Sequence, residues 1–179
     1  AKENGCKSHI DGARIFNAVI STGVPLSRMV RDYDSISICL SKGLGSPIGS
    51  VLVGSSEFIA RAHKWRKMLG GGMRQAGHIA AAGIFALDNH IERMSEDHKR
   101  AKQIAEIIDS HPKFSVDMNT VETNMVYFKT DILASEVVDK FSKFGVKMFD
   151  LDPHSCRIVT HLHITDEDVD NLREIVQNI

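Results

Sequence analysis

The sequence has little of what marks a protein that binds nucleic acid or a membrane. Its 179 residues include 22 basic and 23 acidic side chains, which give a formal net charge of −1, and the basic residues form no cluster. We therefore expect no nucleic-acid partner. The longest strongly apolar run, residues 79–87, is rich in alanine and far shorter than a bilayer-spanning helix. We expect no membrane partner either.

Cysteine is also scarce, and the three thiols, Cys6, Cys39 and Cys156, do not have the spacing of metal ligands. This odd number favours reduced thiols in a cytosolic or organellar compartment, and we expect a cytoplasmic protein. His161 and His163 would share one face of an expected strand, but two histidines without a third ligand give only weak support for a metal site. The sequence thus predicts no metal centre.

What the sequence does contain is a succession of strand and helix patterns, with 42% apolar residues, as in ordinary globular proteins. Residues 35–40 and 51–53 predict two strands around a loop rich in glycine and proline. Helical spacing of apolar residues follows, from Glu57 to Ser110. Beyond Pro112 the patterns predict a compact α+β module whose strands cover residues 114–118, 125–129, 146–149 and 157–164.

Asp11 and Lys42 each follow a short expected strand, and the stretch between them could hold one crossover. In an open α/β sheet, neighbouring strand ends face one crevice, where ligands bind. An aspartate and a lysine that meet there fit pyridoxal phosphate. The amine can form a Schiff base, and the carboxylate can keep the pyridinium nitrogen protonated. The residues alone leave a turn-forming aspartate and a surface lysine as alternatives.

Four segments, in order, resemble the threonine aldolase family: H-I-D-G-A-R at 9–14, S-K-G-L-G-S-P-I-G-S at 41–50, G-G-G-M-R-Q-A-G at 70–77 and R-I-V-T-H-L at 157–162. The likeness covers essentially the whole chain and is to the second half of the family's polypeptide. It implies an α/β fold of the aspartate-aminotransferase type. Residues 1–93 would be the remainder of the large pyridoxal-phosphate-binding domain, and residues 94–179 a small C-terminal α+β domain.

The resemblance implies roles for four residues around the cofactor. Lys42 would be the catalytic lysine that bonds to pyridoxal 5'-phosphate, and Asp11 would pair with the ring nitrogen. Arg14 matches an arginine beside the cofactor. Arg74 matches a basic residue that, in the family, approaches the active site of a neighbouring subunit. Without the family, Arg74 would be interpreted as a solvated surface charge.

The same resemblance implies three residues that bind the substrate. Arg157 matches the arginine that clamps the substrate carboxylate, a task to which a bidentate guanidinium is well suited. Arg14 also lies beside that carboxylate in the family, and Lys67 matches a second basic residue near the active site. An ion pair for Arg157 and a solvated charge for Lys67 are the alternatives that the residues alone leave open.

The implied activity is cleavage of the Cα–Cβ bond of threonine or allo-threonine to glycine and acetaldehyde. Such an enzyme would take part in threonine catabolism and glycine biosynthesis, as a homo-oligomer (a dimer or a homotetramer). Two alternatives stay open: another enzyme of the same fold, such as a β-eliminating lyase or an aminotransferase, and a truncated, non-catalytic fragment. Because the family's phosphate-binding loop belongs to its first half, we expect the isolated chain to bind the cofactor poorly.

Overall fold

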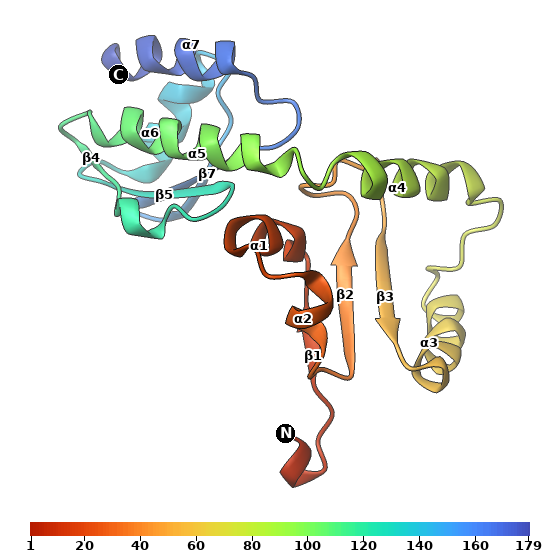
Figure 1. Ribbon diagram of the computed structural model, residues 1–179. Coiled ribbons are helices and arrows are strands. Elements are labelled where there is room, and N and C mark those ends of the chain that lie inside the picture. The colour runs from red at the N-terminus through yellow and green to blue at the C-terminus, as the bar shows by residue number, and fades with distance from the viewer. The chain divides into compact units, whose positions relative to one another are not determined.

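The computed structural model describes residues 1–179 apart from the side chain of Lys2. The chain divides into two compact units, Ala1–Glu92 and Arg93–Ile179 (Figure 1). Each unit has its own sheet, and the first is mixed whereas the second is entirely antiparallel. None of the helices that the structure describes is long and apolar enough to cross a bilayer.

The first unit is built on a three-stranded sheet in the order β1-β2-β3. After a short 3-10 turn, η1 (Lys2–Asn4), β1 (His9–Asp11) runs parallel to β2 (Ser35–Cys39), and β3 (Ser50–Gly54) returns antiparallel to β2. The crossover between the parallel strands contains α1 (Ile15–Thr22) and α2 (Leu26–Val30), as Figure 1 shows. The parallel pairing places the carboxyl ends of β1 and β2 at the same edge of the sheet.

Local signals set the helix ends in this unit. Gly23 ends α1 in the left-handed conformation, with φ 68°, and its N–H bonds the Val19 carbonyl. The Ser55 hydroxyl accepts from the Phe58 N–H and caps α3 (Ser56–Met68). The glycine-rich stretch that follows separates α3 from α4 (Gly77–Asn89). The helices predicted after Glu57 are thus confirmed, with a break at the three glycines.

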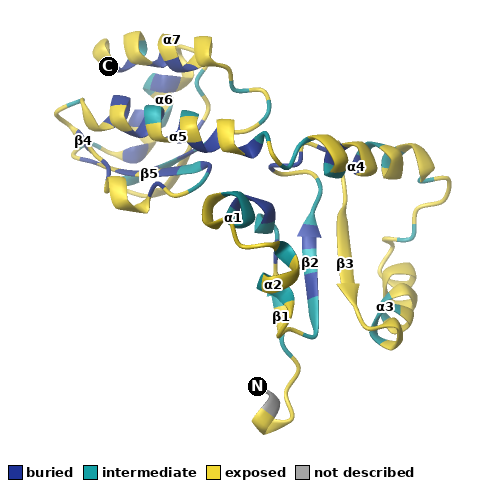
Figure 2. Cartoon of the chain, in the orientation of Figure 1, coloured by how far each residue is buried: buried dark blue, intermediate teal, exposed yellow. Residues whose placement is uncertain are grey.

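Much of the first unit's apolar surface is exposed. Figure 2 shows β2 buried or half-buried, whereas β3 is exposed along its whole length. The helices α3 and α4 also carry large exposed apolar side chains: Trp65, Met68, Ile84 and Phe85. Large exposed apolar side chains are typical of interaction surfaces when they form a contiguous patch.

The second unit contains three helices, four strands and one 3-10 turn. In chain order these are α5 (Met94–Asp109), β4 (Phe114–Ser115), η2 (Met118–Thr120), β5 (Met125–Thr130), α6 (Ala134–Ser142), β6 (Phe149–Asp152), β7 (Ser155–Val159) and α7 (Asp166–Gln177). The antiparallel sheet has the order β4-β5-β7-β6. Thr165 and Asp168 form a capping box at the start of α7.

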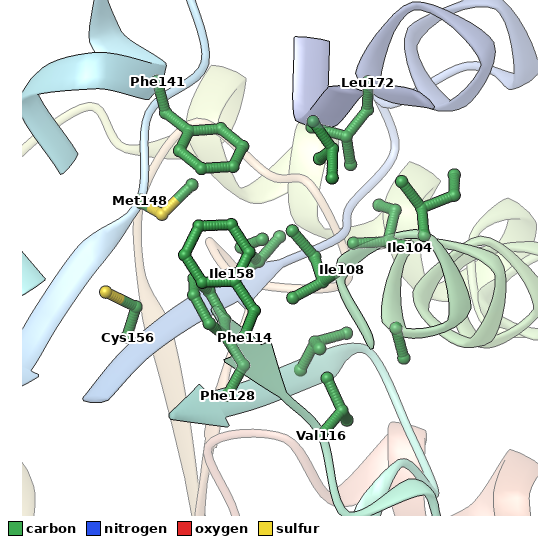
Figure 3. Packing of buried hydrophobic residues seen from close by; sticks show 14 of the residues in the cluster. Ile104, Ile108, Phe114, Val116, Phe128, Phe141, Met148, Cys156, Ile158 and Leu172 are labelled. Atoms are coloured by element: carbon green, nitrogen blue, oxygen red, sulfur yellow. The ribbon is translucent and has the colours of Figure 1, made fainter. Parts of the chain in front are cut away.

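The core of this unit lies on one face of its sheet (Figure 3). Alternate strand residues such as Val126, Phe128 and Ile158 pack there against buried residues of all three helices. Burying one such side chain contributes about 1.5–3 kcal/mol, so this face accounts for most of the unit's packing. The intervening residues of β5 and β7 lie on the opposite face.

Three strand predictions were wrong in their bounds. The expected strand over 114–118 is cut to two residues, because Asp117 caps η2 through its side chain. The expected strands over 146–149 and 157–164 are β6 and β7 at Phe149–Asp152 and Ser155–Val159, since those residues pair with each other across a tight turn.

The two histidines considered as metal ligands therefore lie beyond β7, in a turn. The His161 and His163 rings are 5.7 Å apart, edge to face. No group of three or more metal-binding side chains occurs among the residues that the structure describes.

Candidate functional site

Asp11 is the last residue of β1 and lies opposite Ser37 in the parallel register with β2. The Gly12 N–H donates to the Ser37 carbonyl (2.8 Å), and the Asp11 Oδ1 accepts from the Ala13 N–H (3.2 Å). These bonds turn the chain directly after the carboxylate. Asp11 is thereby fixed, exposed, at the carboxyl edge of the sheet.

The two strands are also tied together at their opposite ends. Asp34, just before β2, accepts hydrogen bonds from the Ser8 N–H (2.9 Å) and from the Lys7 Nζ (3.0 Å). Both interactions hold the pKa of the Asp34 carboxyl below its usual range, the bond from the Ser8 backbone most strongly. With this clamp at one end and Gly12 at the other, the register of β1 on β2 is fixed.

Lys42 lies just beyond the carboxyl end of β2, in a loop that returns to β3. Backbone bonds close the loop, from Gly45 N–H to the Lys42 carbonyl (2.9 Å) and from Leu40 N–H to the Gly49 carbonyl (2.9 Å). Gly45 and Gly49 have φ of 71° and 112°, which side-chain-bearing residues rarely adopt. The Lys42 side chain is exposed, and no carboxylate in the described part of the first unit pairs with its amine.

The loop is anchored to α4 and its end. The His90 Nδ1–H donates to the Leu44 carbonyl (2.6 Å), and the Ser46 hydroxyl donates to the Ala82 carbonyl (3.4 Å). Leu44 itself is buried. The small residues of α4 allow this approach, since a Cβ on Gly83 would lie 3.0 Å from the Leu40 Cδ1 atom. The backbone at Lys42 is thus held in place, while its side chain is exposed.

Arg14 immediately precedes α1 and is half-buried. Its Nε is buried and has no hydrogen-bond partner among the described residues. Buried N–H groups are almost always paired, so this one indicates a place for an acceptor that the described chain does not supply. Two cationic donors, Arg14 and Lys42, together with the carboxylate acceptor of Asp11 therefore fit an anionic group that carries a basic ring nitrogen, which is the chemistry of pyridoxal phosphate.

Lys67 and Arg74 do not belong to the loops that follow β1 and β2. Lys67 is in the last turn of α3, and Arg74 is in the loop between α3 and α4; both are exposed. The Lys67 stem packs over Gly72, where an added Cβ would lie 2.8 Å from the lysine Cδ. Arg157 belongs to the second unit, on β7, and its Nε is also buried without a partner in the part of the chain described.

The sequence interpretation missed a cavity beside the same strands. A cavity of about 430 Å³ lies between β2, β3 and α3, and Ser37, the register partner of Asp11, lines it together with His63 and Arg66. His63 and Arg66 are within 3.2 Å of each other. Their i, i+3 spacing on α3 was the available signal, but it does not reveal which strand residues they face.

Comparison with known proteins places this geometry in a family. A family model described as beta-eliminating lyase matches residues 1–131. The low-specificity L-threonine aldolase 1 of Arabidopsis thaliana is 43% identical over 94% of this chain and 48% of its own length. The low specificity L-threonine aldolase of Escherichia coli K12 is 42% identical over 93% of this chain and 49% of its own length.

A solved structure of the threonine aldolase from Leishmania major superposes with a TM-score of 0.77 at 17% identity. It covers 99% of this chain, which matches 53% of that structure. This similarity confirms the predicted α/β fold class. The chain spans about half the length of the curated relatives it matches.

Proposed function

The chain belongs to the beta-eliminating lyase family, and on that premise we propose that it is part of a pyridoxal-phosphate-dependent aldehyde lyase. The reaction is cleavage of the Cα–Cβ bond of threonine or allo-threonine to glycine and acetaldehyde. The single observation that carries the proposal is the parallel register of β1 and β2, which brings Asp11 and the Lys42 loop to one edge of a sheet. The names of the curated relatives support the choice of substrate.

Within this proposal, four residues hold the cofactor. The Lys42 amine would form a Schiff base with its aldehyde, with release of water, the Asp11 carboxylate would pair with its ring nitrogen, and Arg14 and Arg74 would supply positive charge to its anionic groups. When bound, the cofactor supplies an electron sink for the bond that breaks. The buried, unpaired Nε of Arg14 supports its assignment, because a bound anion would satisfy that donor.

The chain's own residues bind and orient the substrate. Arg157 binds the α-carboxylate, with Arg14 and Lys67 as further cations, and fixing the carboxylate determines which bond of Cα is aligned for cleavage. The Lys42 side chain is exposed, and no carboxylate among the described residues of the first unit pairs with its amine, so once that amine loses a proton it can act as a nucleophile. The Lys42 Nζ would accept a proton when the substrate amine takes its place and would give one up when the product leaves.

We also propose the finer assignments that accompany this function. Residues 1–93 are the remainder of the large cofactor-binding domain, and residues 94–179 are the small C-terminal domain. The protein is a cytoplasmic homo-oligomer, a dimer or a homotetramer, that serves threonine catabolism and glycine biosynthesis. The exposed apolar side chains of α3 and α4 support assembly, since such a surface is covered in a stable protein.

The test is product analysis with and without a complementary half-chain. The 179-residue chain is incubated with pyridoxal phosphate and L-threonine or L-allo-threonine, alone and with the N-terminal half of the Arabidopsis relative. We expect weak cofactor binding by the chain alone. With the half-chain added, we expect visible absorbance from bound cofactor and release of glycine and acetaldehyde, both abolished in Lys42→Ala.

Lys64→Ala is the matched control, because Lys64 is also an exposed lysine, on α3, and its substitution should leave both signals unchanged.

The name of the matching family favours one second function, β-elimination. A keto-acid product in place of glycine and aldehyde would select it. If neither absorbance nor product appears with the half-chain, the proposal fails and the non-catalytic alternative stands.

A further inference from the structure

The second unit leaves one face of its sheet free of the helices. Tyr127 of β5 and Phe149 of β6 are the register partners of Arg157 on β7, one on each side. Register partners point to the same face of a sheet. All three side chains therefore lie on the face opposite Phe128 and Ile158, which belong to the core shown in Figure 3.

On this open face, Phe149 covers the guanidinium group of Arg157. The Arg157 Cζ lies 5.1 Å from the centroid of the Phe149 ring, which is within the range of a cation–π interaction. Phe149 is 60% exposed, although its side chain is large and apolar. The Arg157 Nε beneath this arrangement is buried and unpaired within the described chain. The contact with the Arg157 guanidinium therefore accounts for an aromatic side chain at position 149.

Two arginines near the start of this unit, Arg93 and Arg100, are held by carboxylates instead. The Arg93 Nη2 lies 2.8 Å from Asp97, and the Arg100 Nε lies 2.8 Å from Asp166. Among the described residues, Arg157 has no such carboxylate partner. An aromatic ring restricts the guanidinium without neutralising it, so Arg157 keeps its charge for a ligand.

We propose that Phe149 is a positioning residue for Arg157, which it holds in the orientation that binds the α-carboxylate of the amino-acid substrate. This inference rests on the proposed function for the identity of the ligand, but not for the geometry. A guanidinium already restricted by the ring loses less freedom when it binds. Removal of the ring should therefore weaken carboxylate binding while leaving the bond-breaking step unchanged.

The first test follows the Arg157 Nε–H by NMR in the full 179-residue chain. We expect its hydrogen exchange to be about tenfold faster in Phe149→Leu, which keeps an apolar side chain but loses the π-face, and unchanged in Phe149→Tyr. Phe144→Leu is the matched control, because Phe144 is similarly exposed but lies outside the sheet. Equal exchange in Phe149→Leu and the parent would overturn the proposal.

The second test measures ligand binding and kinetics with the complementary half-chain present. For Phe149→Leu we expect KM for L-threonine to rise about tenfold, with kcat within about twofold, and Phe149→Tyr to restore the parent KM. A lower kcat at unchanged KM would contradict a positioning role. If no variant turns over substrate, the proposed function fails, whereas the exchange measurement still decides whether Phe149 positions Arg157.

Discussion

Gly12 lies so close to β2 that a Cβ atom on it would be 2.6 Å from the Ile36 Cδ1 atom and 2.8 Å from the Ser37 carbonyl oxygen. Backbone cannot give way as a flexible side chain can, so any larger residue must push β1 away from β2. The turn after Asp11 depends on this contact, because the Gly12 N–H bonds the same carbonyl.

We predict that Gly12→Ala destabilises the protein by about 1–3 kcal/mol, the usual cost of overpacking. Urea unfolding followed by circular dichroism measures the change. Gly77→Ala is the control, because an added Cβ at the first residue of α4 would meet nothing within 4 Å and should leave stability unchanged or higher. Equal effects of the two substitutions would refute the steric argument.

Asp11→Asn tests the carboxylate without changing its shape. The asparagine oxygen can still accept the bond from the Ala13 N–H, so we expect the unfolding free energy to change by less than about 1 kcal/mol. Turnover of threonine in the complemented protein should fall at least about tenfold, because a neutral amide cannot stabilise a charged ring nitrogen. Asp32→Asn, at an exposed carboxylate beyond α2, should leave turnover unchanged.

The buried ion pair at the start of the second unit should dominate that unit's sensitivity to mutation. Asp97 is 0% exposed and accepts from Arg93 Nη1 (3.2 Å) and Nη2 (2.8 Å). We predict that Asp97→Ala costs about 3–5 kcal/mol, because it removes both hydrogen bonds to a largely buried guanidinium and leaves it, among the described residues, only the more distant Glu96, at 3.9 Å. In the exposed pair of Arg28 and Asp32, 3.6 Å apart, Asp32→Ala should cost less than about 1 kcal/mol. Similar losses in urea unfolding would contradict this contrast.

Acid should destabilise the second unit through carboxylates whose pKa lies below its usual value. The Thr165 N–H and hydroxyl lower the pKa of Asp168, Arg100 lowers that of Asp166, and Ser155 with the His154 N–H lowers that of Asp152. Each carboxylate binds protons less readily when folded than when unfolded. Their stabilising contribution is therefore present above the ordinary pKa of 3.8 and lost as the pH falls through the lower folded value.

We expect the midpoint of urea unfolding to decrease as the pH falls from about pH 5 to below about pH 3, and to decrease less steeply in Asp168→Asn. That variant removes one of the titrating groups, whereas Asp170→Asn, at an exposed position on α7 and without comparable bonds to the residues that the structure describes, should retain the parent slope. A parent-like slope in Asp168→Asn would show that its bonds to Thr165 do not contribute.

The three thiols should differ sharply in reactivity. Cys6 is exposed, Cys39 is half-buried and Cys156 is buried. Burial raises the pKa of the Cys156 thiol to about 11, and the charges of Asp150 and Asp152 add to the shift. Since the thiolate is the reactive form, we predict that maleimide labels Cys6 first and Cys156 only after unfolding. Mass spectrometry of a time course in native buffer and in urea checks the order; early labelling of Cys156 would contradict the buried position.

The sequence by itself determined the elements whose signals are local. Gly23 ends a helix through its own backbone conformation, and Thr165 caps one through a bond to Asp168. Periodicity identified β2, β3 and β5, and the order of strand, crossover and strand placed Asp11 and Lys42 at neighbouring strand ends. These features depend on residues close together in the chain, so a single sequence contains the information.

Only the tertiary structure decided how distant segments meet. The register of Asp11 on Ser37, the pairing of β6 with β7 and the position of Phe149 over Arg157 each join residues whose patterns would fit more than one alignment. A shift of one residue turns every side chain of a strand to the other face, and the packing of the whole core selects among those alignments. For that reason the residues proposed to hold the cofactor could be assigned from motifs, whereas the contact of Phe149 with Arg157 became visible only in the folded sheet.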